Sequence, residues 1–164
     1  MIVEGDPLPD FDFHAPLLSL PRIFRTDLES IPSKIPYLCP KLASFICLSP
    51  NDKLRIGIAW AGNPKNSNDD TRSVDLQQFS VLFEIEACQF YGLQVGDRRN
   101  DIAKYNYSDA IIDLGADFSD FSDTASAIAE MDLVISVDTS IAHLTGALGK
   151  MGWILLPWIP DWRW

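Results

Sequence analysis

The chain has 164 residues, of which 47% are hydrophobic and 22% are charged, so its length suits one domain with a sizeable core. Its formal net charge of −10 argues against nucleic acid and anionic membrane surfaces as partners, because the long-range field repels both. No apolar stretch approaches the roughly 20 residues of a membrane-spanning helix, and no signal-peptide pattern opens the chain. We therefore expect a cytoplasmic protein without a membrane span.

The three cysteines, Cys39, Cys47 and Cys88, are odd in number and form no CxxC pair, which favours reduced thiols. The two histidines, His14 and His143, have no metal-ligand spacing. We expect neither a metal site nor a cofactor.

Residues 1–52 are rich in proline, which breaks helices and is excluded from central strands. The prolines of this part are Pro7, Pro9, Pro16, Pro21, Pro32, Pro36, Pro40 and Pro50. We expect extended segments and loops here, with one short helix near 16–24. Because such a segment buries little surface alone, we interpret it as a connector or the remnant of a neighbouring domain.

From residue 53 to residue 164, apolar runs typical of buried strands alternate with helical patterns. The expected strands span 54–60, 89–95, 110–114, 133–137 and 153–156. The expected helices span 75–84, with a capping box of Asp75 and Gln78, then 123–131, opened by Ser122 or Asp123, and finally 140–149. This alternation predicts an α/β fold with a doubly wound parallel sheet in the strand order 3-2-1-4-5.

In that order the winding reverses between the first and fourth strands, and ligands bind outside the carboxyl ends of the strands at the reversal. The loops 60–73 and 138–143 follow these two strands and are expected to meet there. No GxGxxG follows the first strand and no GxxxxGK occurs, which is unlike a dinucleotide dehydrogenase or a P-loop NTPase. The fourth strand is therefore the expected phosphate-binding strand.

Asp138, Thr139 and Ser140 form a tight turn between the fourth strand and a helix, whose N-terminal amides and dipole favour an anion. His143 lies one turn later and is expected to project toward the same spot. The turn predicts a nucleotide or nucleotide-sugar site. Two other interpretations stay open: the three turn residues could only cap the helix, and His143 could be a hydrogen-bonded core residue.

An anionic ligand in an acidic protein needs nearby cations. The candidates are Lys65, Arg72, Arg98 and Arg99, each of which could instead be a solvated surface charge. Asp69 and Asp70 are adjacent rather than spaced like a metal-binding pair, and we expect them in a solvated loop.

Three blocks of the chain resemble a known family: GIAWAGNPKNSNDDTRSVDLQQF, FYGLQVGD and DTASAIAEMDLVISVDTSIAHLTGALGKMGWILLPWIPDWRW. The family comprises bacterial tetratricopeptide-repeat proteins with a glycosyltransferase domain similar to heptosyltransferases and, more distantly, to O-linked N-acetylglucosamine transferases. The resemblance covers about residues 54–164. It implies the Rossmann-like, donor-binding half of the two-domain GT-B architecture, here as a C-terminally truncated fragment.

The resemblance also implies roles for individual residues. Those expected at the donor diphosphate are Asp138, Thr139, Ser140, His143 and Arg72. Those expected in a loop that lets the donor come close are Trp60, Ala61, Gly62 and Asn63. Gln94 and Asp97 are expected near the ribose or base. The general base comes from the other half in this family; His14 is the only candidate here, with plain surface as the alternative.

The implied function is the donor half of a glycosyltransferase, which moves a sugar from a nucleoside-diphosphate sugar to a hydroxyl of a protein or glycan without a metal. The alternatives are a non-catalytic nucleotide-sugar-binding module and a Rossmann-like scaffold with a relict pocket. The fragment alone is expected to be inactive, because it lacks the acceptor half.

The tryptophans near the end of the chain are Trp153, Trp158, Trp162 and Trp164. We interpret them as packing against a missing continuation rather than as a sugar-stacking platform. If so, this aromatic segment exposes an apolar patch that promotes self-association.

Overall fold

The computed structural model describes residues 6–40, 48, 50–161 and 164, which lie in two compact units, Met1–Lys34 and Ile35–Trp164. This division differs from the boundary predicted between residues 52 and 53. The backbone amides of Tyr37 and Leu38 both donate to the carbonyl of Ala147, at 3.0 and 3.2 Å. These bonds attach the segment after Lys34 to the second unit.

The first unit contains one short helical segment, formed by the 3-10 turn η1 (Leu17–Ser19) and the helix α1 (Leu20–Ile23). It lies within the predicted range of 16–24. Neither element has a buried residue, and large apolar side chains such as Leu18 and Phe24 are exposed. The described part of this unit therefore has no core of its own.

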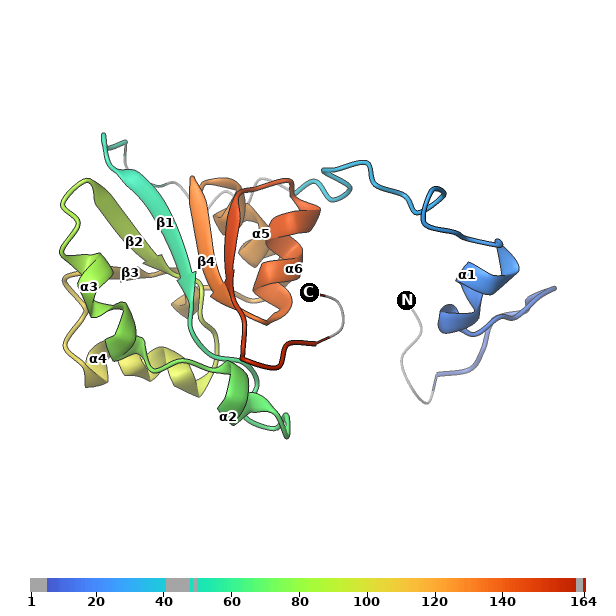
Figure 1. Ribbon diagram of the computed structural model, residues 1–164, viewed down its shortest axis with the longest axis horizontal. Coiled ribbons are helices and arrows are strands. Elements are labelled where there is room, and N and C mark those ends of the chain that lie inside the picture. The colour runs from blue at the N-terminus through green and yellow to red at the C-terminus, as the bar shows by residue number, and fades with distance from the viewer. Residues whose placement is uncertain (1–5, 41–47, 49, 162–163) are drawn as a thin grey trace. The chain divides into compact units, whose positions relative to one another are not determined.

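The second unit is built on a five-stranded parallel sheet, and its order β3-β2-β1-β4-β5 confirms the predicted topology (Figure 1). The strands are β1 (Leu54–Ala59), β2 (Cys88–Gly92), β3 (Ile111–Asp113), β4 (Leu133–Val137) and β5 (Gly152–Leu155). In the central pair, Ile58 of β1 is in register with Ile135 of β4. The winding reverses between these two strands, as expected.

Several short helices and two longer ones connect the strands. They are α2 (Asp69–Arg72), η2 (Leu76–Phe79), α3 (Ser80–Phe83), η3 (Asp97–Asn100), α4 (Asp101–Lys104), η4 (Leu114–Ala116), α5 (Phe121–Ala129) and α6 (Ser140–Ala147). The first predicted helix, 75–84, is split into the 3-10 turn η2 and the α-helical turn α3. The sequence patterns did not indicate α2 or the segment η3–α4.

The helix α5 begins earlier than predicted because Asp120, and not Ser122 or Asp123, is its N-cap. The Asp120 carboxylate accepts from the amides of Ser122 and Asp123, and the Asp123 carboxylate accepts from the Asp120 amide in return. This reciprocal capping box satisfies amides that the first turn leaves without intrahelical partners. The helix α6 ends just before Gly149, whose left-handed φ of 67° is typical of the residue that follows a helix C-terminus.

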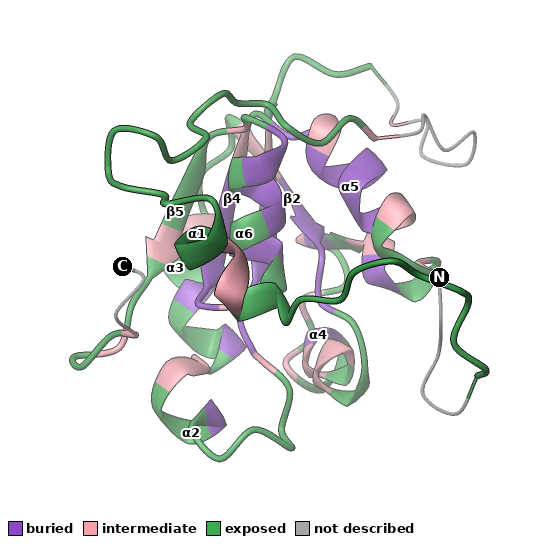
Figure 2. Ribbon diagram, turned by 90° about the vertical axis from the view of Figure 1, so that its right-hand side faces the viewer, coloured by how far each residue is buried: buried purple, intermediate pink, exposed green. Residues whose placement is uncertain are grey.

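The core of the second unit consists of two apolar clusters, one on each face of the sheet. Figure 2 shows buried ribbon in the strands β2 and β4 and in the helices α5 and α6. The side chains of β1 alternate between them: Ile58 packs with Leu76 and Phe79, whereas Ala59 packs with residues of α5 and α6. Ile128 and Met131, near the end of α5, are fully buried. Helices therefore cover both faces, which explains why the central strands are mainly apolar.

None of the helices in the described part of the chain is long and apolar enough to cross a membrane. Cys39 is exposed and Cys88 is half-buried, and both are free thiols. Cys47 lies outside the described residues.

Asp75 joins two of the short helices through its carboxylate. It accepts from the backbone N–H of Gln77 and from the hydroxyl of Tyr105, each at 2.9 Å, and the same hydroxyl accepts from Lys104. The Gln77 amide first, and then the Tyr105 hydroxyl, lower the pKa of Asp75 below its ordinary value of 3.8. The bond from Gln77, rather than the predicted pairing with Gln78, caps η2.

Because the folded-state pKa of Asp75 is lowered, its carboxylate stabilises the fold above the unfolded-state pKa, and this contribution is lost as the pH falls through the folded-state pKa. We expect Asp75→Asn to lower the thermal midpoint at pH 7 and to have a progressively smaller effect below about pH 4. Thermal unfolding followed by circular dichroism between pH 7 and pH 3 measures this, with Asp109→Asn, at an exposed turn position, as the control. A constant difference between wild type and Asp75→Asn across this range would contradict the assignment.

Candidate functional site

A cleft with a volume of about 820 Å³ lies over the carboxyl ends of the strands in the second unit. Such a volume suits a ligand of nucleotide size. Its lining comes from four regions of the chain, in each case just after a strand or at the start of a helix. The lining includes Ala61, Gly62, Asn63 and Arg72 after β1, Gln94, Asp97 and Arg98 after β2, Phe118, Asp120 and Phe121 before and in α5, and Thr139, Ser140 and Ile141 at the start of α6. The two loops predicted to meet at the reversal of the sheet therefore border the same cleft.

The turn between β4 and α6 combines a capping role with a place in the cleft. Thr139 is the N-cap of α6: its hydroxyl accepts from the Ile141 amide at 3.3 Å and lies 3.2 Å from the hydroxyl of Ser136. Ser140 is exposed and lines the cleft beside it. The capping interpretation is thus confirmed for Thr139, and it leaves the amino end of α6 directed at the cleft.

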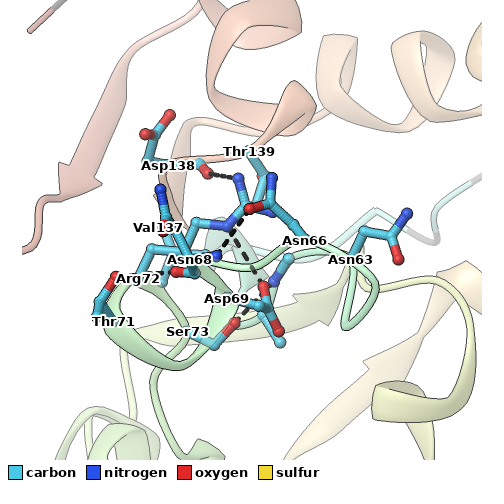
Figure 3. A network of polar contacts seen from close by, with 12 residues as sticks. Asn63, Asn66, Asn68, Asp69, Thr71, Arg72, Ser73, Val137, Asp138 and Thr139 are labelled. Carbon is cyan, nitrogen blue, oxygen red and sulfur yellow. Dashed lines mark hydrogen bonds and ion pairs between the residues drawn. The ribbon is translucent and has the colours of Figure 1, made fainter. Parts of the chain in front are cut away.

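Arg72 connects the loop after β1 to the turn after β4 (Figure 3). Its Nη1 donates to the backbone carbonyl of Asp138 at 3.3 Å, and its Nε lies 3.3 Å from Oδ1 of Asp69. Asp138 meets the guanidinium through this carbonyl, while its carboxylate points away from Arg72 in Figure 3. Arg72 is therefore the one cation for which the described residues show a bridge across the predicted seam.

Asp69 is not solvated, contrary to expectation. Its side chain is only 8% exposed, because α2 folds it under Arg72, whereas Asp70 is exposed. The spacing of Asp69 and Arg72, three residues apart, is the helical spacing of an ion pair. That spacing could have been noticed in the sequence, but the burial of Asp69 follows only from the packing of the loop.

Position 62 requires a glycine because the side chains of Arg72 and Asp69 pack closely against it. A Cβ atom at this position would collide with Nη2 of Arg72 and with Oδ1 of Asp69. The amide of Gly62 donates to the hydroxyl of Ser73 at 3.0 Å, which ties both ends of the loop together. Ala61 and Asn63 line the cleft on either side of Gly62, and their expected contact with a donor stays a prediction.

Gln94 holds the start of this loop from the end of β2. Its side chain is buried; Oε1 accepts from the amides of Trp60 and Ala61, and Nε2 donates to the carbonyls of Ala61 and Val95. Both ends of the Gln94 side-chain amide are therefore hydrogen-bonded to backbone groups, which gives Gln94 a structural role in the cleft lining. A single polar residue inside the apolar run that follows β2 was the sequence signal for it.

Trp60 belongs to the core rather than to the ligand loop. The side chain is fully buried in the cluster with Ile58 and Leu76, and its Nε1 donates to Asp101 at 3.1 Å. The same oxygen of Asp101 lies 3.0 Å from Nε of Arg98, so this carboxylate orients a second arginine of the cleft lining. The predicted donor-loop role of Trp60 is therefore not supported by its position.

The far wall of the cleft is formed by residues that the sequence patterns did not single out. Phe118 and Phe121 supply apolar surface, with Phe121 exposed, and Asp120 lies between them at the start of α5. The capping-box spacing of Asp120 and Asp123 marks this helix start in the sequence. Because β3 is parallel to β4, the segment after it reaches the same edge of the sheet.

Several predicted site residues lie elsewhere. His143 is exposed, is absent from the cleft lining, and stacks on Trp164, with ring centroids 5.0 Å apart and an angle of 20° between the rings. Neither of the positions expected for it, facing the ligand or inside the core, is therefore the observed one. Lys65 is exposed and outside the lining, and Arg99 pairs with Asp113 at 2.7 Å instead. His14 is exposed in the first unit, near Phe11.

The charges lining the cleft balance one another. Arg72 and Arg98 face Asp97 and Asp120, and each arginine has its Nε paired with a carboxylate three residues away. Among the residues that the structure describes, no group of three His, Cys, Asp or Glu side chains is arranged to hold a metal ion. The chemistry available in the cleft is therefore that of guanidinium groups and helix-start amides, both of which bind oxyanions.

The aromatic segment near the end of the chain is largely exposed where it is described. Trp153 on the edge strand β5 is 60% exposed and Trp158 is 99% exposed, whereas Trp164 packs on His143. Trp162 lies outside the described residues. Self-association through this segment stays a prediction.

The chain matches no family model, no curated protein and no solved structure. The sheet order and the helices on both faces define its class as an α/β protein with a doubly wound, Rossmann-like sheet.

The contacts around Gly62 predict a local steric cost. We expect Gly62→Ala to lower the free energy of unfolding by about 1–3 kcal/mol, because the added methyl group must displace Arg72 or Asp69. Urea unfolding measures this. Gly146→Ala is the matched control: a methyl group there meets nothing within 4 Å, and alanine is favoured within α6 by about 0.5–1 kcal/mol. Equal effects of the two substitutions would contradict the tight seating of Arg72 on Gly62.

Proposed function

We propose that the cleft binds a nucleoside-diphosphate sugar and that the second unit is the donor-binding half of a glycosyltransferase. The observation that carries this proposal is the bridge from Arg72 to the Asp138 carbonyl, beside the amino end of α6. A guanidinium and helix-start amides are thereby directed at one place, at the reversal of a parallel sheet. The resemblance in sequence to heptosyltransferase-like domains points to the same ligand class.

The composition of the cleft supports a ligand with an anionic group and an apolar or aromatic one. Arg72, Thr139 and Ser140 form its polar end, where a diphosphate would be bound. Phe118 and Phe121 offer apolar surface on which a base could stack. Because Gln94 is occupied by backbone groups, we assign the base to these phenylalanines and leave Asp97 as the candidate for the ribose hydroxyls.

The proposed reaction is displacement at the anomeric carbon of the sugar. The acceptor hydroxyl loses its proton to a base, its oxygen bonds to the anomeric carbon, and the bond to the diphosphate oxygen breaks. The leaving diphosphate gains negative charge in the transition state. Arg72 and the amides at the start of α6 would stabilise that charge more than the ground state, which lowers the barrier without a metal ion.

A second candidate function is binding of the nucleotide sugar without transfer. It is favoured by the role of Asp120, one of two carboxylates in the cleft lining, whose Oδ1 accepts from the amides of Ser122 and Asp123 and is thereby used to cap α5. Because the chain alone is expected to be inactive, turnover of a nucleotide sugar is assayed with and without an added acceptor-binding half, in the presence of acceptor proteins or glycans. Turnover only in the presence of that half supports transfer, and nucleotide binding without turnover in either case supports a binding module. A scaffold with a relict pocket is the third possibility, and it predicts no binding at all.

The proposal predicts that ADP, UDP or GDP binds the full chain. It also predicts that Arg72→Ala raises the dissociation constant of that nucleotide at least tenfold while the fold is retained. The physical reason is the loss of a charge-assisted, potentially bidentate contact with the diphosphate. Isothermal titration calorimetry measures the dissociation constants, and circular dichroism checks the fold.

Arg55→Ala is the matched control, because Arg55 lies at the amino end of β1 and pairs with Glu130 at 3.0 Å, away from the cleft lining. No binding of any of the three nucleotides at millimolar concentration would overturn the proposed function. Equal dissociation constants for wild type and Arg72→Ala would remove Arg72 from the site.

A further inference from the structure

We propose that Asp69 is a positioning residue for the ligand diphosphate, which it never touches, and that it acts by orienting Arg72 toward the cleft. This inference rests on the proposed function of the cleft. It concerns an acidic side chain beside an anion site, where a negative charge would ordinarily weaken binding. The geometry around Asp69 indicates why such a charge is present.

Asp69 lies behind Arg72 with respect to the cleft. Its side chain is 8% exposed and is not part of the cleft lining, whereas the Arg72 side chain is 19% exposed and lines it. Oδ1 of Asp69 accepts from Nε of Arg72 at 3.3 Å. Burying a carboxylate without a cationic partner costs free energy, so the buried Asp69 needs Arg72 beside it. The pair is therefore part of the packing around α2 rather than a contact between two solvent-exposed side chains.

The guanidinium of Arg72 is held by two polar contacts. Asp69 accepts from Nε and the carbonyl of Asp138 accepts from Nη1, while Nη2 occupies the space that a Cβ atom at Gly62 would need. The planar group offers five N–H donors in a fixed fork, so fixing Nε and one Nη1 donor sets the direction of the others. An arginine without these contacts would lose several rotatable bonds of freedom on binding a ligand, and this loss weakens affinity.

Two effects of Asp69 on anion affinity oppose each other. Its charge lowers the local positive potential, whereas its hydrogen bond to Nε keeps Arg72 in the bridging position. Asp69→Asn separates them, because asparagine has the same size, keeps one oxygen acceptor for Nε, and removes the charge by replacing the other oxygen with an NH2 group. Asp69→Ala removes both the charge and the acceptor.

The test is a double-mutant cycle on the full chain, with calorimetric titration of whichever of ADP, UDP and GDP binds wild type. We expect Asp69→Ala alone to raise the dissociation constant roughly three- to tenfold. In the Arg72→Ala background the same substitution is expected to leave the dissociation constant unchanged or to lower it, because the orienting bond is already lost and only the removal of the negative charge remains. Asp69→Asn is expected to bind at least as tightly as wild type.

The neighbouring exposed residue provides the control Asp70→Ala, which should leave the dissociation constant unchanged. Circular dichroism follows the thermal midpoint of every variant. If Asp69→Ala is unfolded at the titration temperature, Asp69→Ser takes its place in the cycle, because the serine side chain is one bond shorter and cannot reach Nε in the same way.

The outcomes distinguish this inference from the proposed function. Absence of nucleotide binding by wild type would overturn the proposed function and, with it, the inference. Binding by wild type that Arg72→Ala weakens, together with an Asp69→Ala effect that is absent or equal in both backgrounds, would overturn the inference alone. Asp69→Asn binding as weakly as Asp69→Ala would also overturn it, because the retained acceptor should preserve the orientation of Arg72.

Discussion

The hydrogen bond from Arg72 to the carbonyl of Asp138 is the contact on which the site depends. It joins two loops that are far apart in the sequence and that follow the two central strands. In a parallel sheet the loops that follow the strands all begin at the edge formed by the carboxyl ends. Because the winding reverses between β1 and β4, the loops after these two strands run in opposite directions and leave a space between them. A side chain long enough to cross that space is required to connect them, and a guanidinium can do so while still offering donors to a ligand.

The loops around the cleft keep their shape because their backbone groups have buried polar partners. Gln94, just after β2, accepts hydrogen bonds from the backbone amides of Trp60 and Ala61 after β1. Thr139 caps α6, and Asp120 caps α5. Unpaired buried amides and carbonyls are costly, so each of these side chains favours one loop conformation over the alternatives. The cleft is thus bordered by segments whose positions are set before any ligand arrives, which limits the ordering cost of binding.

The pairing of each cleft arginine with an aspartate bears on the proposal that this acidic protein binds an anion. With a formal net charge of −10, the overall field repels anionic ligands, and affinity must come from local groups. Asp69 and Asp101 hold Arg72 and Arg98 by their Nε atoms, which keeps the cations at the cleft wall instead of in solvent. Local geometry therefore has to compensate for the unfavourable long-range charge.

The amino-acid sequence by itself determined the alternation of strands and helices, because apolar periodicity and helix boundaries are local properties. The parallel sheet and its order were then predicted correctly from the usual arrangement of such an alternation. The sequence also indicated Arg72, Gly62 and the Asp138–Ser140 turn, since each has a characteristic type and place after a strand. Only the tertiary structure decided that Asp69 is buried, that Gln94 binds backbone, that Trp60 is in the core and that His143 stacks on Trp164. These outcomes depend on which residues the packing brings within a few ångströms of one another, and sequence spacing carries no information on that for segments from different strands and loops.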